Sequence, residues 1–562
     1  MLAPLDEEAA RAAIRALVAG DDGVEAIAIA LLWAFRHPVH EQRLAELVAE
    51  EAPGVFVTLS SEAAPRQGEY ERTVATVINA YVGPASSAYL DELADAMGER
   101  GLPRAPMIMQ GNGGVMPVDV ARRLPVTTIG SGPAGGLAGA AAIATASGHP
   151  NVIATDMGGT SFEVGLIVDG RPLLTGQEIL DQYTFHMPRL DVRSIACGGG
   201  SIAAVDPHGG GLRVGPESAG SDPGPACYGR GAQPTVTDAD IVLGLLDPDA
   251  FLGGRMTLDR GAAERAVAGL AEQLGLSVDE AAAGILRVNA FQAGTLIRQR
   301  TIEQGLDPRD FVVYAFGGAG PLHAFAFAEE LGVGEVVVPL GNGASTLSAY
   351  GIAASDLVRT FEQECRIRTP LDPDALSAVL GDVSARARAA LQDSGHDPDT
   401  AEYHGTALMR YAEQFVQELP IELPERIDAA ACAEVMARFD EEYGRLFGAG
   451  ARAVFQAAEV FTVRLTTRIP LGFTPSPAAG PAAPEAAPAS RTRDVYWPAE
   501  GRRVATAIVA GAALPAGEAI HGPAVIELPH TAVAVARGQR VTRDALGSFV
   551  LTIADHDPGA HR

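Results

Sequence analysis

The sequence of 562 residues contains no lysine, so every basic side chain other than histidine is arginine. Such a protein cannot use the phosphate-binding lysine of a P-loop, a lysine Schiff base or a lysine general base. A nucleotide bound by this chain must therefore be held by backbone amides, a metal ion and arginine. A GC-rich genome accounts for the exchange of lysine for arginine, and the chemical consequence holds either way.

Positive charge is scarce as well, with 42 basic against 70 acidic residues and a formal net charge of −28. Phosphate backbones and anionic lipid surfaces are recognised by basic protein surfaces, so we expect neither nucleic acid nor a membrane as a partner. No apolar run reaches the roughly 18 residues of a membrane span. The first residues are acidic and amphipathic, which is not typical of a signal peptide.

Cysteine is also rare, and the four cysteines are Cys197, Cys227, Cys365 and Cys432. No two of them have the spacing of metal ligands, and four in a chain of this length do not make a disulfide framework. We therefore expect a reduced, cytoplasmic protein.

The length allows roughly three or four domains. Strands and helices alternate near the start of the chain, which predicts an α/β fold. The expected divisions are an N-terminal remnant (1–68), a core domain (69–356), a mainly helical region (357–471), a Pro/Ala linker (472–491) and a β-rich module (492–556).

Glycine, by contrast, is abundant, and the stretch "DMGGTS" places it behind a carboxylate. Asp156 ends a predicted strand, Gly158 and Gly159 allow a tight turn, and Thr160 and Ser161 supply hydroxyls. The chain then returns as a second strand, so the motif predicts a β-hairpin. Successive amides in such a turn can bind an anion, and the carboxylate beside them can hold Mg²⁺. An ordinary hairpin turn remains the alternative.

Another glycine turn lies in "AFGGAGPLHAFAFAEEL", residues 315–331. An apolar strand ends at Gly317 and Gly318, and a helix begins after Gly320. A glycine turn that opens a helix presents free N–H groups and can lie against a nucleoside. A tight strand–helix joint is the alternative, and we expect His323 to be a packing residue.

A further glycine turn lies in "LDVRSIACGGGSIAAVD", where Asp191 and Arg193 precede it. Its four members, which could form another backbone cradle, are Gly198, Gly199, Gly200 and Ser201. Small residues recur along the predicted helix 130–144, which permits close helix packing. The long Gly/Pro-rich segment 214–240 is predicted to be a substrate or interface loop.

Taken together, these segments resemble the hydantoinase A/5-oxoprolinase family, which includes subunits of acetone and acetophenone carboxylases. The resemblance runs from residue 4 to about residue 553. The motifs that carry it include "EYERT", "NAYVGP", "GPAGG", "DMGGTS", "GGGSIA", "VGPESAG", "DPGPACYGRG", "PTVTDAD", "LDPDAFLGGRM", "AFGGAGPLHA" and "GPAVIE".

The resemblance implies a two-lobed α/β fold like that of the actin, heat-shock-protein and sugar-kinase ATPases, with "DMGGTS" as its second phosphate hairpin. "AFGGAGPLHA" would be the adenosine element, and "GPAGGLAGAAA" and "GASTLSAYGIAAS" the two connecting helices. The family normally begins with a "GGTFTD"-like hairpin, and no second GGT occurs here. We therefore expect an N-terminally incomplete fold, through a truncated gene model, a separate chain or a loss of activity.

The implied reaction is ATP-dependent phosphorylation of the carbonyl oxygen of a cyclic amide, followed by ring opening with a B-type partner subunit in a hetero-oligomer. ATP and Mg²⁺ are the implied cofactors. Asp156 would hold Mg²⁺ and act with Glu163 and Arg193, while the residues of the three glycine turns would bind the nucleotide. Glu163 stands where the family commonly has aspartate, and Cys197 where it has a small residue.

Two other functions remain open. A ketone carboxylase subunit would use the same phosphorylation step and then fix bicarbonate, and "TSFEV" is similar to that branch. A non-catalytic scaffold would keep the fold and bind the partner. We expect this chain on its own not to turn over ATP.

Overall fold

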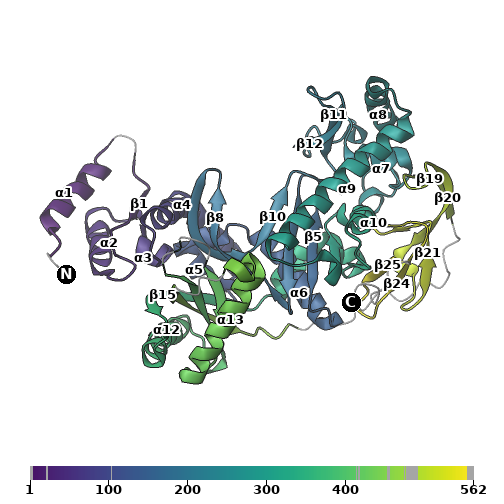
Figure 1. Cartoon of the computed structure of the whole chain (residues 1–562). Helices are drawn as coiled ribbons and strands as arrows, with labels where there is room; N and C mark the ends of the chain where they lie inside the picture. The colour runs from purple at the N-terminus through teal and green to yellow at the C-terminus, as the bar shows by residue number, and fades with distance from the viewer. Residues whose placement is uncertain are drawn as a thin grey trace. The chain divides into compact units, whose positions relative to one another are not determined.

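The computed structural model describes residues 4–20, 23–102, 104–412, 414, 418–451, 456–473, 475 and 491–553. The chain divides into two compact units, each assembled from segments that are far apart in sequence (Figure 1). Unit 1 comprises Met1–Ala134, Leu174–Leu190 and Ser355–Gly472, and unit 2 comprises Gly135–Leu173, Asp191–Ala354 and Phe473–Arg562. The consecutive domain boundaries expected from the sequence therefore do not coincide with the compact units.

Unit 1 is built around a six-stranded sheet in the order β17-β16-β18-β15-β4-β3, with the parallel pair β1–β2 and the hairpin β8–β9 beside it in the same unit. Its helices and strands are α1 (Glu7–Val18), β1 (Ala26–Ile29), α2 (Val39–Glu51), β2 (Phe56–Leu59), α3 (Ser60–Ala63), α4 (Glu69–Glu99), β3 (Met107–Met109), β4 (Val115–Pro117), α5 (Val118–Arg123), β8 (Leu174–Leu180), β9 (Tyr183–Leu190), β15 (Leu357–Arg368), α12 (Pro373–Asp393), β16 (Glu402–Tyr411), β17 (Leu419–Glu422), α13 (Ala429–Phe447) and β18 (Ala458–Ile469).

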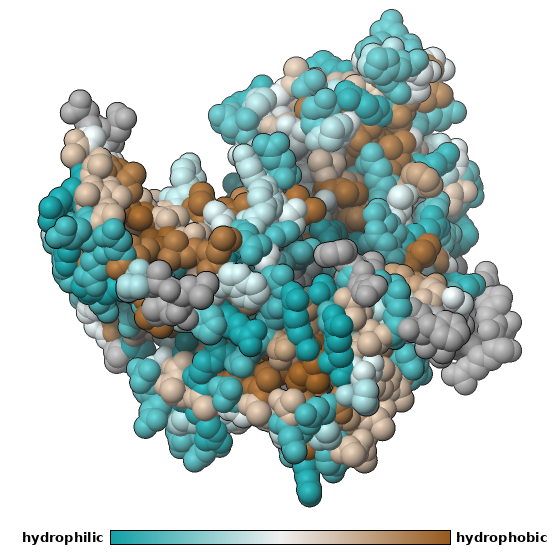
Figure 2. Space-filling model, turned by 60° about the vertical axis from the view of Figure 1, so that its left-hand side comes forward, coloured by the Kyte–Doolittle hydropathy of each residue, from teal (hydrophilic) through white to brown (hydrophobic). Residues whose placement is uncertain are grey.

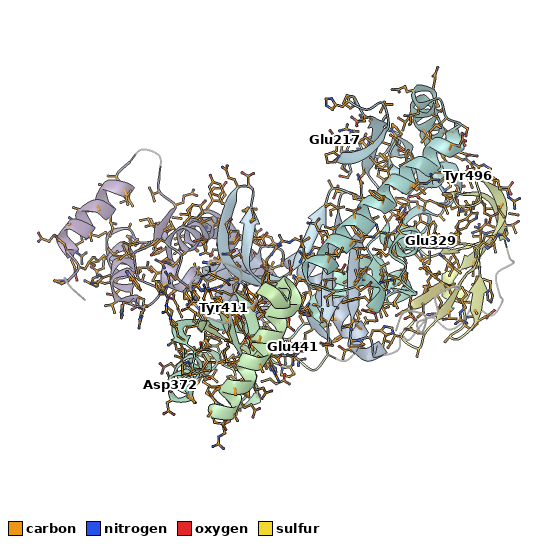
Figure 3. All side chains as sticks on the ribbon, viewed as in Figure 1. Glu217, Glu329, Asp372, Tyr411, Glu441 and Tyr496 are labelled. Carbon is orange, nitrogen blue, oxygen red and sulfur yellow. The ribbon has the colours of Figure 1, made fainter. Side chains whose placement is uncertain are left out.

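The sequence predicted that residues 357–471 are mainly helical. This prediction is wrong, because β15, β16, β17 and β18 accompany α12 and α13. Helix α13 packs on this sheet through an aromatic cluster that includes Tyr411 (Figure 3). The rings of Tyr411 and Phe439 lie 5.3 Å apart. The strands carry charged residues at buried positions, such as Glu362 and Arg464, whose side chains bond to each other at 2.7 Å. These buried charges interrupt the apolar alternation by which a strand is predicted from sequence.

Unit 2 contains the segments that carry the sequence motifs. Its helices and strands are α6 (Ser131–Ser147, which begins before the unit boundary), β5 (Val152–Met157), β6 (Phe162–Val168), β7 (Arg171–Pro172), β10 (Val192–Ile195), β11 (Ser201–Val205), β12 (Leu212–Ser218), α7 (Val236–Leu243), α8 (Arg260–Leu274), α9 (Val278–Glu303), β13 (Val312–Phe316), α10 (Gly320–Leu331), β14 (Glu335–Val338), α11 (Leu347–Ala354), β19 (Arg491–Trp497), β20 (Arg502–Ala510), β21 (Ala519–His521), β22 (Ala524–Glu527), β23 (Ala532–Val535), β24 (Gln539–Arg543) and β25 (Phe549–Ile553).

The main sheet of unit 2 runs β10-β6-β5-β13-β14-β25-β24-β21, with β7 paired to β6. Its centre is parallel, since β13 pairs in parallel with both β5 and β14. The C-terminal strands β25, β24 and β21 extend this sheet, and β19, β20, β22 and β23 form a separate four-stranded sheet. The β-rich C-terminal segment is thus partly built into the central sheet. Residues 476–490 of the expected linker lie outside the described residues.

Helices α6 and α11 pack with their backbones in close contact. A Cβ atom on Gly351 of α11 would overlap with the carbonyl of Gly135 in α6, and one on Gly139 would lie 2.8 Å from the carbonyl of Leu347. Close packing of α6 against α11 therefore accounts for the small residues in this part of the "GPAGGLAGAAA" motif.

The molecular surface in Figure 2 is a mosaic in which hydrophilic residues separate several hydrophobic patches, as expected for a chain with a large net charge. Within the described ranges, none of the helices is both long and apolar enough to cross a lipid bilayer.

Candidate functional site

The three glycine turns predicted from the sequence meet within unit 2. Numbered in chain order, the first turn (158–161) joins β5 to β6, the second (198–201) joins β10 to β11, and the third (317–320) joins β13 to α10. Backbone hydrogen bonds connect them: Gly199 N–H to Gly158 O (3.0 Å), Gly200 N–H to Gly159 O (2.6 Å) and Ala319 N–H to Met157 O (2.9 Å). The hairpin predicted for "DMGGTS" is present, with β5 and β6 antiparallel.

Two acidic residues pair across the strands of this hairpin, next to its turn. Asp156 on β5 lies directly opposite Glu163 on β6. Burial raises the pKa of Asp156 to about 6. Mg²⁺ is commonly bound by one or two carboxylates together with phosphate oxygens. The described residues contain no cluster of three or more His, Cys, Asp or Glu side chains that could hold a metal by themselves.

The second glycine turn does not form the backbone cradle expected from the sequence. Its amides are already used, because Gly198 N–H donates to Ser201 Oγ at 2.9 Å and the next two donate to the first turn. Ser201 is buried, so its hydroxyl is committed to this contact. A Cβ atom on Gly198 would lie 2.8 Å from Gly158 O, which explains the need for glycine. This turn supports the first turn and leaves no amide for a phosphate.

Arg193 lies away from the two carboxylates. It pairs with Val164 across β10 and β6, whereas its neighbour Ser194 pairs with Glu163. Side chains alternate between the faces of a sheet, so Arg193 points to the face opposite Asp156 and Glu163. The Arg193 side chain is 45% exposed and lies 3.5 Å from Asp191. The structure therefore does not bring Arg193 together with the other predicted catalytic residues.

A pocket opens beside the first and third glycine turns, entirely within unit 2. Its empty space is about 900 Å³, solvent at its mouth included. Its lining residues are Gly158, Gly159, Gly199, Tyr228, Thr237, Asp240, Leu245, Leu246, Asp247, Ala250, Phe251, Leu252, Gly318, Ala319, Leu322, Glu527, Leu528, Pro529, His530, Thr531 and Ala532.

One end of the pocket is glycine and the rest is largely apolar. The apolar wall combines leucine side chains with Tyr228 and Phe251, whose rings are 6.0 Å apart. Asp247 and Glu527 of the lining are neutralised, because Arg493 binds both Asp247 (2.9 Å) and Glu527. A ligand with a planar apolar part and a charged part would fit a pocket divided in this way.

Sequence reasoning missed the contribution of residues 527–532 to the pocket. Thr531 Oγ donates to Gly318 O at 3.1 Å, and His530 N–H donates to Asn342 Oδ1 at 2.9 Å. These bonds hold the C-terminal segment against the third glycine turn. The motif "GPAVIE", which ends at Glu527, was the sequence signal that could have identified this segment. Its position in space, however, depends on the long-range pairing of β25 with β14.

The Gly/Pro-rich segment 214–240 is ordered by one buried carboxylate. Asp238 accepts hydrogen bonds from Ala226 N–H (3.1 Å), Cys227 N–H (2.8 Å) and the N–H and hydroxyl of Thr235 (2.9 and 2.8 Å). The segment thereby brings Tyr228 to the pocket, in agreement with a ligand-binding role. Burial raises the pKa of the Cys227 thiol.

Cys197 is a packing residue. Its Sγ donates to Asn289 Oδ1 at 2.8 Å, and burial raises the pKa of the thiol to about 12. A thiol in this state is a poor nucleophile and a poor metal ligand. Its place before the glycine triplet is therefore explained by packing against α9.

Three glycines of the pocket are not explained by the protein itself. A Cβ atom on Gly158, Gly159 or Gly318 would meet no heavy atom within 4 Å. None of the three has the positive φ that favours glycine. Because they line the pocket, the space beside their backbone is available to a ligand.

Comparison with known proteins identifies relatives of this chain. The hydantoinase/oxoprolinase domain matches residues 72–361, and the hydantoinase/oxoprolinase C-terminal domain matches residues 372–552. Caprolactamase subunit alpha of Pseudomonas jessenii is 35% identical over 98% of this chain and 79% of that protein. The acetophenone carboxylase gamma subunit of Aromatoleum aromaticum is 32% identical over 100% of this chain and 78% of that protein.

Solved structures agree with these matches. The crystal structure of the ATP-dependent caprolactamase from Pseudomonas jessenii superposes with a TM-score of 0.88 at 35% identity, over 99% of this chain and 80% of that one. Nucleotide-free acetone carboxylase gives a TM-score of 0.73 at 30% identity, over 98% and 79%. The mixed α/β fold is shared with both. This chain belongs to the hydantoinase/oxoprolinase family.

Proposed function

We propose that the pocket of unit 2 binds ATP with Mg²⁺, and that the γ-phosphoryl group is transferred to the carbonyl oxygen of a cyclic amide. Ring opening would then be completed with a B-type partner subunit. The observation that carries the proposal is the group of pocket glycines whose missing side chains leave room for a ligand and not for the protein. Relatives named as ATP-dependent enzymes and as subunits support it.

The residues present fit this ligand. The exposed turn at Gly159 and Thr160 offers backbone amides and a hydroxyl to phosphate. Asp156 and Glu163 form a pair suited to a divalent cation. Positioning and charge neutralisation carry phosphoryl transfer, so the absence of lysine is compatible with it.

When bound, ATP would supply the phosphoryl group. Phosphorylation turns the carbonyl oxygen of the substrate, which is a poor leaving group, into part of a good leaving group. The chain would hold the phosphate end at the glycine turns and the base against the apolar wall around Phe251 and Leu322. The parallel strands β5 and β13, each ending in a glycine turn, support the proposed actin-like class of fold.

The amide substrate is favoured over a ketone by the closer structural agreement with caprolactamase, at a TM-score of 0.88 against 0.73. Both branches would share the phosphorylation step. With the B-type partner present, release of ADP that depends on lactams or hydantoins supports the amide hydrolase. Release that depends on a ketone and bicarbonate supports the carboxylase instead.

The binding half of the proposal is tested by calorimetric titration of MgATP into the full chain, alone and with the partner. We expect Gly159→Val to lower the affinity at least tenfold, because its side chain would occupy the phosphate end of the pocket. Gly211→Val is the matched control, since a Cβ there also meets nothing within 4 Å but lies outside the pocket. No MgATP binding by the wild type in either state would favour the scaffold function.

A further inference from the structure

We propose that Asp240 binds the ribose hydroxyls of the nucleotide and that His323 is a positioning residue that fixes the Asp240 carboxylate. The inference rests on the proposed function and adds a specificity determinant to it. Asp240 lies on α7 and lines the pocket, and His323 lies on α10 beside it. Both side chains are 4% exposed.

The carboxylate of Asp240 lacks donors, since the nearby Nε2 of His323 also has no hydrogen-bond partner among the described residues. Its Oδ2 lies 3.3 Å from Nε2 of His323, whereas its buried Oδ1 has no hydrogen-bond partner among the described residues. A buried carboxylate oxygen without a donor is unfavourable, and a ligand that brings a donor relieves it. Asp240 is thus prepared to accept a hydrogen bond from outside the protein.

Asp238, two residues earlier on the same helix, shows what a structural carboxylate looks like here. Both of its oxygens accept hydrogen bonds, from three backbone amides and one hydroxyl. Asp247 and Glu527 also line the pocket, but both are paired with Arg493. Among the carboxylates that line the pocket, Asp240 is therefore the one with an oxygen that lacks a donor.

The position of Asp240 selects the part of the ligand that it meets. One turn earlier on α7, Thr237 Oγ donates to Gly199 O at the glycine end of the pocket. Beyond Asp240 the chain continues into Leu245 of the apolar wall. The Asp240 carboxylate would repel phosphate and would find no hydrogen-bond donor on the face of a base. It is therefore placed opposite the sugar, which lies between the phosphate and the base. Ribose hydroxyls are neutral donors, and hydrogen bonds to a charged acceptor are the stronger kind.

The test compares MgATP with its 2′-deoxy and 3′-deoxy analogues on the full chain by calorimetry. A site that hydrogen-bonds a hydroxyl rejects the analogue lacking it, so we expect at least one deoxy analogue to bind about 10- to 100-fold more weakly. Asp240→Leu, which keeps the volume and removes the acceptor, should bind ATP and both analogues equally. Asp249→Asn changes an exposed carboxylate that does not line the pocket, and this control should keep the discrimination.

The role of His323 has its own readout. His323→Gln should leave ATP binding measurable and reduce the discrimination between ATP and the deoxy analogue, whereas a purely structural histidine would change stability and not discrimination. Equal affinity of the wild type for all three nucleotides overturns the assignment of Asp240 and leaves the proposed function standing. Failure of the wild type to bind MgATP overturns both. The analogue series on the wild type needs no variant, so loss of folding by Asp240→Leu would not block the test.

Discussion

The turn at Gly158 and Gly159 and the turn at Gly198 and Gly200 contact each other, and they contain glycine for different reasons. In the second turn a Cβ atom would lie 2.8 Å from backbone of the first, so the protein itself excludes a side chain. In the first turn a Cβ atom would meet nothing within 4 Å. The comparison separates a glycine needed for folding from a glycine that leaves room for a ligand.

The third turn contains both kinds within two residues. Gly317 has a φ of +84°, and a Cβ there would overlap with the Asp156 carboxylate and the Met157 carbonyl. Gly318 next to it faces open space and lines the pocket. The pocket is therefore built by packed glycines that bring the turns together and by open glycines that border the ligand.

The largest expected effect is on the packed side of the comparison. Gly317→Ala should lower the free energy of unfolding by about 4 kcal/mol, because it combines left-handed strain with overpacking. Urea unfolding measures it. Gly332→Ala is the matched control, since its φ is +69° but its Cβ would meet only Arg309 side-chain atoms at 3.8 Å or more, and we expect about 1 kcal/mol. Equal losses in the two variants would contradict the packing explanation.

The second-largest expected effect is that of the Asp156 carboxylate on the stability of the protein. The pKa of Asp156 is raised from an ordinary value of 3.8 to about 6 by burial, so the folded state binds the proton more tightly than the unfolded state. The stability contributed by this group therefore falls as pH rises from about 4 to about 6. Asp156→Asn removes this cost and should stabilise the protein by about 3 kcal/mol at pH 8.

The pH dependence supplies the control for this prediction. At pH 4 both Asp156 and its asparagine replacement are largely uncharged in the folded protein, so the two proteins should unfold at nearly the same urea concentration. A stabilisation that is equal at pH 4 and pH 8 would show that burial of charge is not its cause. Together with loss of MgATP binding, stabilisation at pH 8 would identify a residue kept for function at the expense of stability.

The sequence predicted the hairpin, the three glycine turns and the α/β class, because each depends on local patterns of glycine and strand residues. It did not predict that the amides of the Gly198 turn are used internally, since that depends on which backbone groups meet across the fold. The face on which Arg193 lies depends on the register of β10 with β6. The role of Asp240 depends on the absence of a partner, which no sequence pattern reveals.

The smallest expected effect on stability is on the open side of the comparison. Gly158→Ala should raise the free energy of unfolding by about 0.5 kcal/mol, because alanine restricts the unfolded chain and its Cβ meets no atom in the folded one. Thermal unfolding of the ligand-free chain measures it, with Gly198→Ala as the packed control, which should be destabilised by about 2 kcal/mol. Destabilisation of Gly158→Ala by as much as Gly198→Ala would mean that the first turn also needs glycine for folding. A stable Gly158→Ala protein with weakened MgATP binding would show that glycine is required at this position for ligand binding and not for folding.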